Sequence, residues 1–224
     1  MAIKPILFNS EMVRAILDGR KSCTRRVLKP QPDEKHTYPL DFVTDSTEKK
    51  EVGCFGFGID EYGGSIQYAK PPYQPGDILY VRETWSPVFV RPRRYLYKVE
   101  CKEAENLPIK FHPSIHMPKE AARIWLKVTD VRVERLQEMK PVDVIKEGAY
   151  PDCWDCLNTY GESGSQCCYG TEEQCSQCDE VMMEWEKLWN STIKKTDLDS
   201  YGWEANPWVW VIEFERCEKP GIES

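Results

Sequence analysis

The chain has 224 residues, of which 30% are charged and 41% hydrophobic, and its formal net charge is −7. This length suits one elaborated domain or two small ones, and the acidic balance argues against a protein that coats nucleic acid without selectivity. No segment approaches the about 20 consecutive apolar residues of a membrane helix, and the N-terminus does not resemble a signal peptide. We therefore expect a cytosolic protein with no membrane partner.

The first predicted element is a short helix in residues 9–19. Asn9 or Ser10 can cap this helix, because either side chain can accept from a free N–H of the first turn. Gly19 suits the left-handed residue that ends a helix. The apolar face of the helix is predicted to consist of Met12, Val13, Ile16 and Leu17.

Short strands dominate the rest of the chain. Residues 29–53 are polar and proline-containing, which predicts a surface excursion, and residues 51–69 predict two strands around a Gly-Gly turn. This pattern indicates an α+β fold around a mainly antiparallel sheet that could close into a barrel. Further strands are predicted within 74–85, 93–100, 122–136 and 206–216, and helices within 140–148 and 179–193.

A cysteine-rich segment separates the last two predicted helices. Cys153 and Cys156 form one C-x2-C pair and Cys175 and Cys178 form another, a spacing typical of structural zinc sites. Four thiolates would close a tetrahedral site and leave no position open for water. Cys167 or Cys168 could replace one of these ligands. The alternative is a reduced loop without metal.

The basic stretch "GRKSCTRR", residues 19–26, gathers four cations in an acidic chain. Arginine and lysine after a helix can simply complement its dipole or form a solvated face. The alternative is a ligand site. On a regular strand Lys21 and Thr24 would face opposite sides, so a shared site requires the chain to turn after Gly19.

The helix, "GRKSCTRR", "PGDILYVRETW" and the strand leading to "IKEG" together resemble the ASCH family of the PUA-like superfamily, especially long phage and prophage members. The resemblance covers roughly residues 3–28, 73–86, 120–149 and 205–216. It implies a PUA-like β-barrel with flanking helices, and RNA or a modified nucleoside as partner. It also implies host cytoplasm as the location if the protein is phage-encoded.

The resemblance divides the chain into four parts. The ASCH domain would comprise residues 1–149 together with 180–217, with 29–72 as an insertion. Residues 150–179 would form the cysteine-rich insert that binds zinc, and 218–224 a C-terminal tail.

One branch of the family hydrolyses N4-acetylcytidine to cytidine and acetate with a Lys, a Thr and a distant Glu. Its G-x-K-x-x-T-x-R pattern falls on residues 19–26, which implies Lys21 as base, Thr24 as nucleophile and Glu147 as the group serving the leaving amine. Arg25 departs from the branch, where a neutral residue is usual.

Five further side chains are expected to bind substrate or nucleic acid. Trp85 could stack on a base or pack in the core. The expected binding residues are Arg20, Arg25, Arg26, Arg82 and Trp85.

The alternatives to an amidohydrolase are a non-catalytic module that binds RNA or a modified base and, less favoured, a phage interaction protein.

Overall fold

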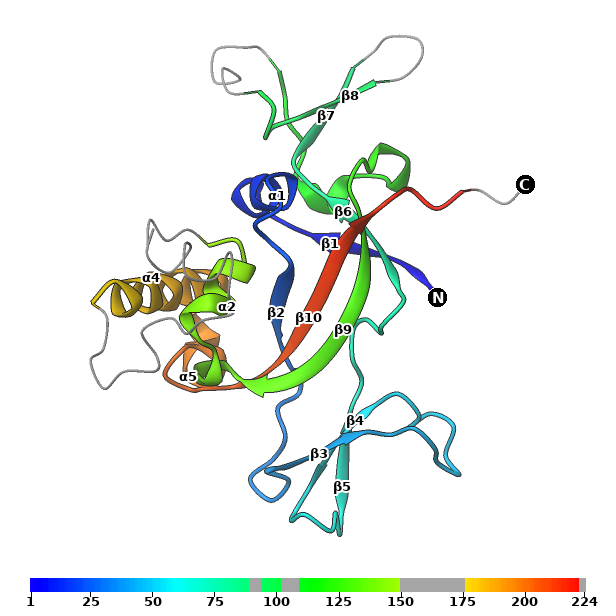
Figure 1. Cartoon of the computed structure of the whole chain (residues 1–224), viewed down its shortest axis with the longest axis vertical. Helices are drawn as coiled ribbons and strands as arrows, with labels where there is room; N and C mark the ends of the chain where they lie inside the picture. The colour runs from blue at the N-terminus through cyan, green and yellow to red at the C-terminus, as the bar shows by residue number, and fades with distance from the viewer. Residues whose placement is uncertain (89–93, 102–108, 150–175, 222–224) are drawn as a thin grey trace, which may run out of the picture.

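The structure, a computed structural model, describes residues 1–88, 94–101, 109–149 and 176–221, with the backbone alone for 176–179. Its centre is a five-stranded sheet in the order β1-β6-β9-β10-β2. The β1–β6 pair is parallel and the other three pairs are antiparallel. Figure 1 shows β9 and β10 as two long, curved neighbours. The strands are β1 (Ile3–Leu7), β2 (Cys23–Val27), β6 (Ile78–Arg82), β9 (Trp125–Arg135) and β10 (Trp208–Cys217).

This arrangement confirms an α+β fold with mainly antiparallel strands, but the described residues form no closed barrel. In the described part of the chain, no hydrogen-bonded ladder joins the edge strands β1 and β2. The Arg26 side chain instead donates to the Leu7 carbonyl over 3.1 Å. One side-chain contact does not close a sheet, because closure needs successive backbone pairs between the first and last strands.

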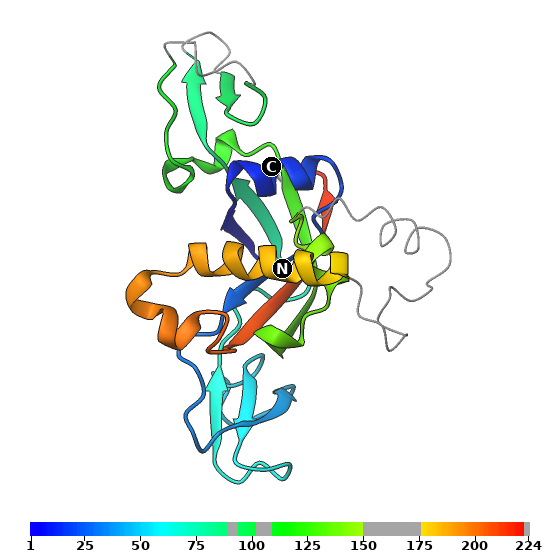
Figure 2. The same cartoon turned by 90° about the vertical axis from the view of Figure 1, so that its left-hand side faces the viewer.

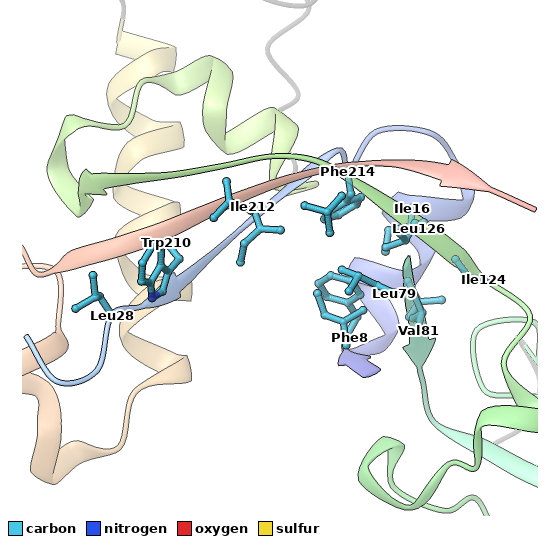
Figure 3. Packing of buried hydrophobic residues seen from close by; sticks show 14 of the residues in the cluster. Phe8, Ile16, Leu28, Leu79, Val81, Ile124, Leu126, Trp210, Ile212 and Phe214 are labelled. Carbon is cyan, nitrogen blue, oxygen red and sulfur yellow. The ribbon is translucent and has the colours of Figure 1, made fainter. Parts of the chain in front are cut away.

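Strand β10 is buried on both faces, which explains its nearly continuous apolar run "WVWVI". Successive side chains of a strand point to opposite faces. Trp210 and Ile212 therefore join the main core beneath the sheet (Figure 3), while Val209 and Val211 pack in a second cluster on the other face. Helix α4 covers this second face with Trp185 and other apolar residues.

Two smaller sheets extend from opposite ends of the main sheet in both views (Figures 1 and 2). Strand β3 lies in the segment expected to be a surface excursion; no strand was predicted there, but its residues are mainly exposed, so it stays at the surface. The Phe42 ring at the end of β3 packs edge-on against the Phe55 ring, with centroids 5.2 Å apart. This contact forms only after the chain folds back, which local sequence does not reveal. The strands are β3 (Tyr38–Phe42), β4 (Phe55–Gly58), β5 (Ile66–Ala69), β7 (Trp85–Val88) and β8 (Arg94–Tyr97).

The predicted helices are present. Asn9 caps α1 by accepting from the Met12 N–H over 2.8 Å, and Gly19 follows the helix with a φ of 77°. No helix in the described ranges is both long and apolar enough to cross a membrane. The helices are α1 (Ser10–Leu17), α2 (Pro141–Lys146), α4 (Ser176–Thr192) and α5 (Leu198–Tyr201).

Candidate functional site

The basic stretch begins with a turn. After Gly19, the N–H groups of Arg20 and Lys21 both donate to the Ala15 carbonyl, over 2.9 and 3.1 Å. The Ser22 N–H then donates to the Lys146 carbonyl of α2 over 2.9 Å, and strand β2 starts only at Cys23. Lys21 therefore leaves strand geometry, as a shared site with Thr24 requires.

The end of α2 lies directly against this turn. Gly148 has a φ of 77°, and a Cβ there would come within 2.6 Å of Ala15 Cβ and 2.8 Å of Lys21 Cβ. Both the backbone conformation and the space exclude a side chain at this position. The glycine thus allows Glu147, the residue before it, to meet Lys21.

Lys21 and Glu147 form a buried ion pair. The Lys21 Nζ donates to Glu147 Oε2 over 2.9 Å, to the Glu147 carbonyl over 2.7 Å and to the Cys23 carbonyl over 2.7 Å. Their side chains are 0% and 2% exposed. All three N–H bonds of the ammonium are therefore used inside the protein.

Arg25 completes the cluster from the next part of β2. Its guanidinium contacts Glu134 at 3.1 Å, Asp143 at 3.6 Å and Glu147 at 3.5 Å, and its side chain is 0% exposed. Arg25 was expected to bind nucleic acid, but three carboxylates surround it and solvent does not reach it. Its charge instead helps hold Glu147, because Oε1 of that carboxylate faces Arg25 while Oε2 faces Lys21.

Thr24 points to the other face of β2. Thr24 pairs with Ile212 of β10 and therefore lies on the face of the main core. Arg25 pairs with Val211 and lies on the opposite face, where α2 and α4 pack. Thr24 is 1% exposed. Among the described residues, no hydrogen bond joins it to Lys21 or Glu147. The structure therefore brings Lys21 and Glu147 together but leaves Thr24 without a direct bond to either.

Phe8, a buried residue of the main core, lies beside two cations of the basic stretch. The Lys21 Nζ is 5.3 Å from the centroid of its ring, and the Arg26 guanidinium is 5.7 Å from the same centroid. Arg26 shares its face of β2 with Thr24, since alternate residues of a strand point the same way. Of the two arginines that end the basic stretch, Arg26 is partly exposed and Arg25 is not.

The other expected binding residues are distributed over the molecule. Arg20 contacts Asp18 at 3.0 Å, and Arg82 donates to the Met117 carbonyl over 2.8 Å. Trp85 packs against the rings of Tyr95 and His112, with centroids 5.6 and 5.4 Å away, at the base of the β7–β8 hairpin. This position favours packing over stacking on a base next to the basic stretch.

A cleft of about 370 Å³ lies between the start of α1, the end of α2 and helix α4. Its wall is mainly apolar, with Arg20, Glu147 and Gly148 at one side. Neither Lys21 nor Thr24 lines it. The volume falls within the range of small-molecule sites. The apolar part of the wall includes Met12, Val144, Val181, Trp185 and Leu188.

Burial also determines the pKa of the Cys23 thiol, which lies in this region. Burial, and after it the Glu147 carboxylate, raises the pKa of the Cys23 thiol to about 12, although Arg25 and Lys21 act in the opposite direction. A thiol that stays protonated at neutral pH is a poor nucleophile and a poor metal ligand. Cys23 is therefore a packing residue.

Most of the expected zinc site lies outside the described residues. Cys153, Cys156 and Cys175 are not described at all. Cys178 belongs to α4, but only its backbone is described. Within the described ranges, no group of His, Cys, Asp or Glu side chains is arranged to hold a metal ion.

Two acidic residues of the cluster, Glu134 and Asp143, were missed from the sequence. A signal existed for Asp143 in α2, because it precedes Glu147, the residue that caps this helix, by four positions, and such residues share a helix face. No comparable signal marks Glu134, which reaches Arg25 only through the pairing of β9 and β2 with β10. The chain matches no family model, no curated protein and no solved structure.

Proposed function

We propose that this chain is a nucleobase-directed protein of the ASCH type, with a PUA-like arrangement of its main sheet, and that it hydrolyses N4-acylated cytidine. The observation that carries the proposal is the contact of Lys21 with Glu147, two residues of the family's Lys, Thr and Glu pattern, at 2.9 Å. The sequence resemblance supplies the reaction class; the contact supports it because the two residues come from distant segments.

The pair could supply both a base and an acid. Transfer of one proton from Lys21 to Glu147 gives a neutral amine and a neutral carboxylic acid in contact. The Thr24 oxygen then attacks the acyl carbon, and its proton passes to Lys21. As the C–N bond breaks, Glu147 gives its proton to the N4 amine of the leaving cytidine. These two transfers return Lys21 and Glu147 to their charged forms. Water then attacks the acyl-threonine, which releases the acid and restores the Thr24 hydroxyl.

Two conditions follow from the geometry. The Thr24 hydroxyl must approach Lys21 around the edge of β2, where the Phe8 ring lies. Access must also open, because Lys21, Thr24 and Glu147 are only 4%, 1% and 2% exposed. Substrate binding therefore has to move side chains at this edge, and Arg26, which donates to the Leu7 carbonyl there, is the partly exposed cation beside the entrance.

The second candidate is a binding module without chemistry. The complete use of the three Lys21 donors and the near-zero exposure of the pair favour it, since a saturated buried ion pair can serve stability alone. In that case the same edge of the sheet binds RNA or a modified base through Arg26, and Lys21 and Glu147 hold the turn and α2 in place.

The test is incubation of the purified full chain with N4-acetylcytidine, followed by chromatographic measurement of cytidine and acetate. The Thr24→Ala variant is expected to lose several orders of magnitude of activity, since it lacks the nucleophile. Ser22→Ala is the matched control, because Ser22 is a nearby exposed hydroxyl and its loss should leave turnover unchanged. Binding of acylated nucleosides or RNA without any turnover would leave the binding module as the function.

A further inference from the structure

A serine, a histidine and an aspartate form a connected chain beside the three-stranded sheet. The His36 Nδ1 lies 2.7 Å from Asp33 Oδ1, and His36 Nε2 lies 3.1 Å from Ser65 Oγ. We propose that Ser65, His36 and Asp33 form a second hydrolytic site, with Ser65 as nucleophile, His36 as base and Asp33 as its positioning residue, acting on short-chain acyl esters. Such constellations are recognised by geometry, whatever the fold or the order of residues in the chain.

The hydrogen bonds of Asp33 determine which ring nitrogen of His36 carries the proton. Asp33 Oδ1 accepts from the His36 ring and from the backbone N–H groups of Lys35 and His36, over 2.9 and 3.0 Å for the latter two. The bond from the His36 side chain, followed by that from Lys35, holds the pKa of Asp33 below its usual range. An ionised carboxylate only accepts, so in the neutral imidazole the proton lies on Nδ1 and Nε2 offers its lone pair to the Ser65 hydroxyl.

The aspartate and histidine are held by β5 and the linker before β3. The Asp33 N–H donates to Gln67 Oε1 over 3.0 Å, and Gln67 Nε2 donates to the Gln31 carbonyl over 3.4 Å. The His36 side chain is only 14% exposed. A base held in this way keeps its orientation toward the serine, which nucleophilic catalysis requires.

The serine follows a tight glycine turn between β4 and β5. Gly64 has a φ of 54°, and a Cβ there would lie 2.7 Å from Ile59 Cδ1, so the turn requires glycine. In the described part of the chain, no hydrogen bond uses the N–H of Gly64 or of Ser65. These N–H groups are available to the negative oxygen that develops when Ser65 attacks an acyl carbon.

The reaction balances with water as the only co-reactant. Ser65 Oγ bonds to the acyl carbon while its proton passes to His36 Nε2, and the imidazolium faces the Asp33 carboxylate. The ester C–O bond then breaks, and the alcohol leaves with that proton. Water attacks the acyl-serine through the same base and releases the acid.

The surroundings of Ser65 indicate the substrate class. Ser65 is exposed, and the nearby turn and β5 carry exposed apolar side chains, with Tyr62 88% and Ile66 37% exposed. An open surface of this kind contacts a short acyl chain but does not enclose a long one. The site is separate from the Lys21–Glu147 pair, so its test does not depend on nucleoside hydrolysis.

The experiment treats the intact full-length protein with a fluorophosphonate, which bonds to an activated serine oxygen with loss of fluoride. Peptide mass spectrometry should find the phosphonate on Ser65, and the protein should hydrolyse p-nitrophenyl acetate. His36→Gln should slow labelling about 100-fold or more, since it removes the base. Asp33→Asn should slow it too.

Ser46→Ala is the matched control, because the Ser46 hydroxyl donates to a carboxylate, Glu51 Oε2, over 2.9 Å and has no imidazole beside it. Its loss should change neither labelling nor hydrolysis. Absence of label on Ser65 in the wild-type protein would overturn the proposal whatever the stability of the variants. Equal labelling rates in folded His36→Gln and wild-type protein would overturn it as well.

Discussion

Glu147 and Lys21 stand 126 residues apart in the sequence, yet the carboxylate of one lies 2.9 Å from the ammonium of the other. Both side chains are shielded from water, and the Arg25 guanidinium shares the same carboxylate. Their contact fixes the end of α2 against the turn that precedes β2. It thus serves both the proposed reaction and the stability of the fold.

Removing the carboxylate should destabilise the protein strongly. The Glu147→Gln variant leaves Lys21 and Arg25 buried with less compensating charge, and such changes typically cost about 3–5 kcal/mol. Urea unfolding measures the loss. Glu184→Gln is the control, because Glu184 pairs with Lys187 at 2.7 Å on the exposed face of α4, and its loss should cost much less. Similar losses in both variants would contradict the importance of the buried pair.

The two arginines at the end of the basic stretch should differ in effect. Arg26→Ala should weaken RNA binding and reduce the slope of log affinity against log salt by about 1, as the loss of one phosphate contact implies. Arg25→Met should lower the free energy of unfolding but leave that slope unchanged, because Arg25 is buried among carboxylates. Salt titrations of RNA binding measure the first effect, and urea unfolding measures the second. A reduced slope in folded Arg25→Met would contradict the assignment.

The cysteine-rich insert is expected to bind one zinc ion through Cys153, Cys156, Cys175 and Cys178. Elemental analysis of protein purified without chelators should give about one equivalent per chain, as a single four-thiolate site implies. Replacing Cys153 and Cys156 by Ser should abolish zinc binding. Replacing Cys101 and Cys217, which lie outside the insert, should leave the zinc content unchanged. If protein purified without chelators contains no zinc, the predicted site is refuted.

The carboxylate of Asp77 should make stability depend on acidic pH. Burial alone would raise its pKa, but bonds from the Lys4 ammonium and from the N–H groups of Ala2 and Gln74 hold the pKa below its usual value. A depressed folded pKa contributes stability above the unfolded pKa of about 3.9. That contribution is lost as pH falls from about 4 through the folded pKa.

The measurement is urea unfolding between pH 6 and pH 2. Wild-type protein should lose stability below about pH 4 more steeply than Asp77→Asn, which cannot titrate at this position. Asp199→Asn is the control, because it removes a carboxylate that lies exposed on α5. Parallel profiles for wild type and Asp77→Asn would show that the carboxylate contributes no such dependence.

Cys23 should resist alkylation in the native protein. Its pKa of about 12 and its 2% exposure leave almost no thiolate accessible at pH 8. Mass spectrometry after iodoacetamide treatment should find the partly exposed Cys101 modified before Cys23, which should react only after unfolding. Rapid modification of Cys23 in folded protein would mean that the edge of β2 opens readily.

The sequence by itself determined the elements whose signals are local. The apolar spacing and the Asn9 cap predicted α1, the Gly-Gly turn predicted the β4–β5 hairpin, and the period of two predicted β9. Each of these signals can be recognised within one window of the sequence, although β9 itself pairs with the distant strands β6 and β10. Strand β3 was missed because its stability comes from distant aromatic packing.

Only the tertiary structure decided which charges meet. The basic stretch suggested four equivalent cations, but the turn after Gly19 and the alternation along β2 bury Lys21 and Arg25 and leave Arg26 partly exposed. The sequence could not show this, because burial of an ion depends on carboxylates that α2 and β9 bring from more than 100 residues away. The chain of Asp33, His36 and Ser65 arises in the same way. A linker and a glycine turn meet only when the three-stranded sheet has formed.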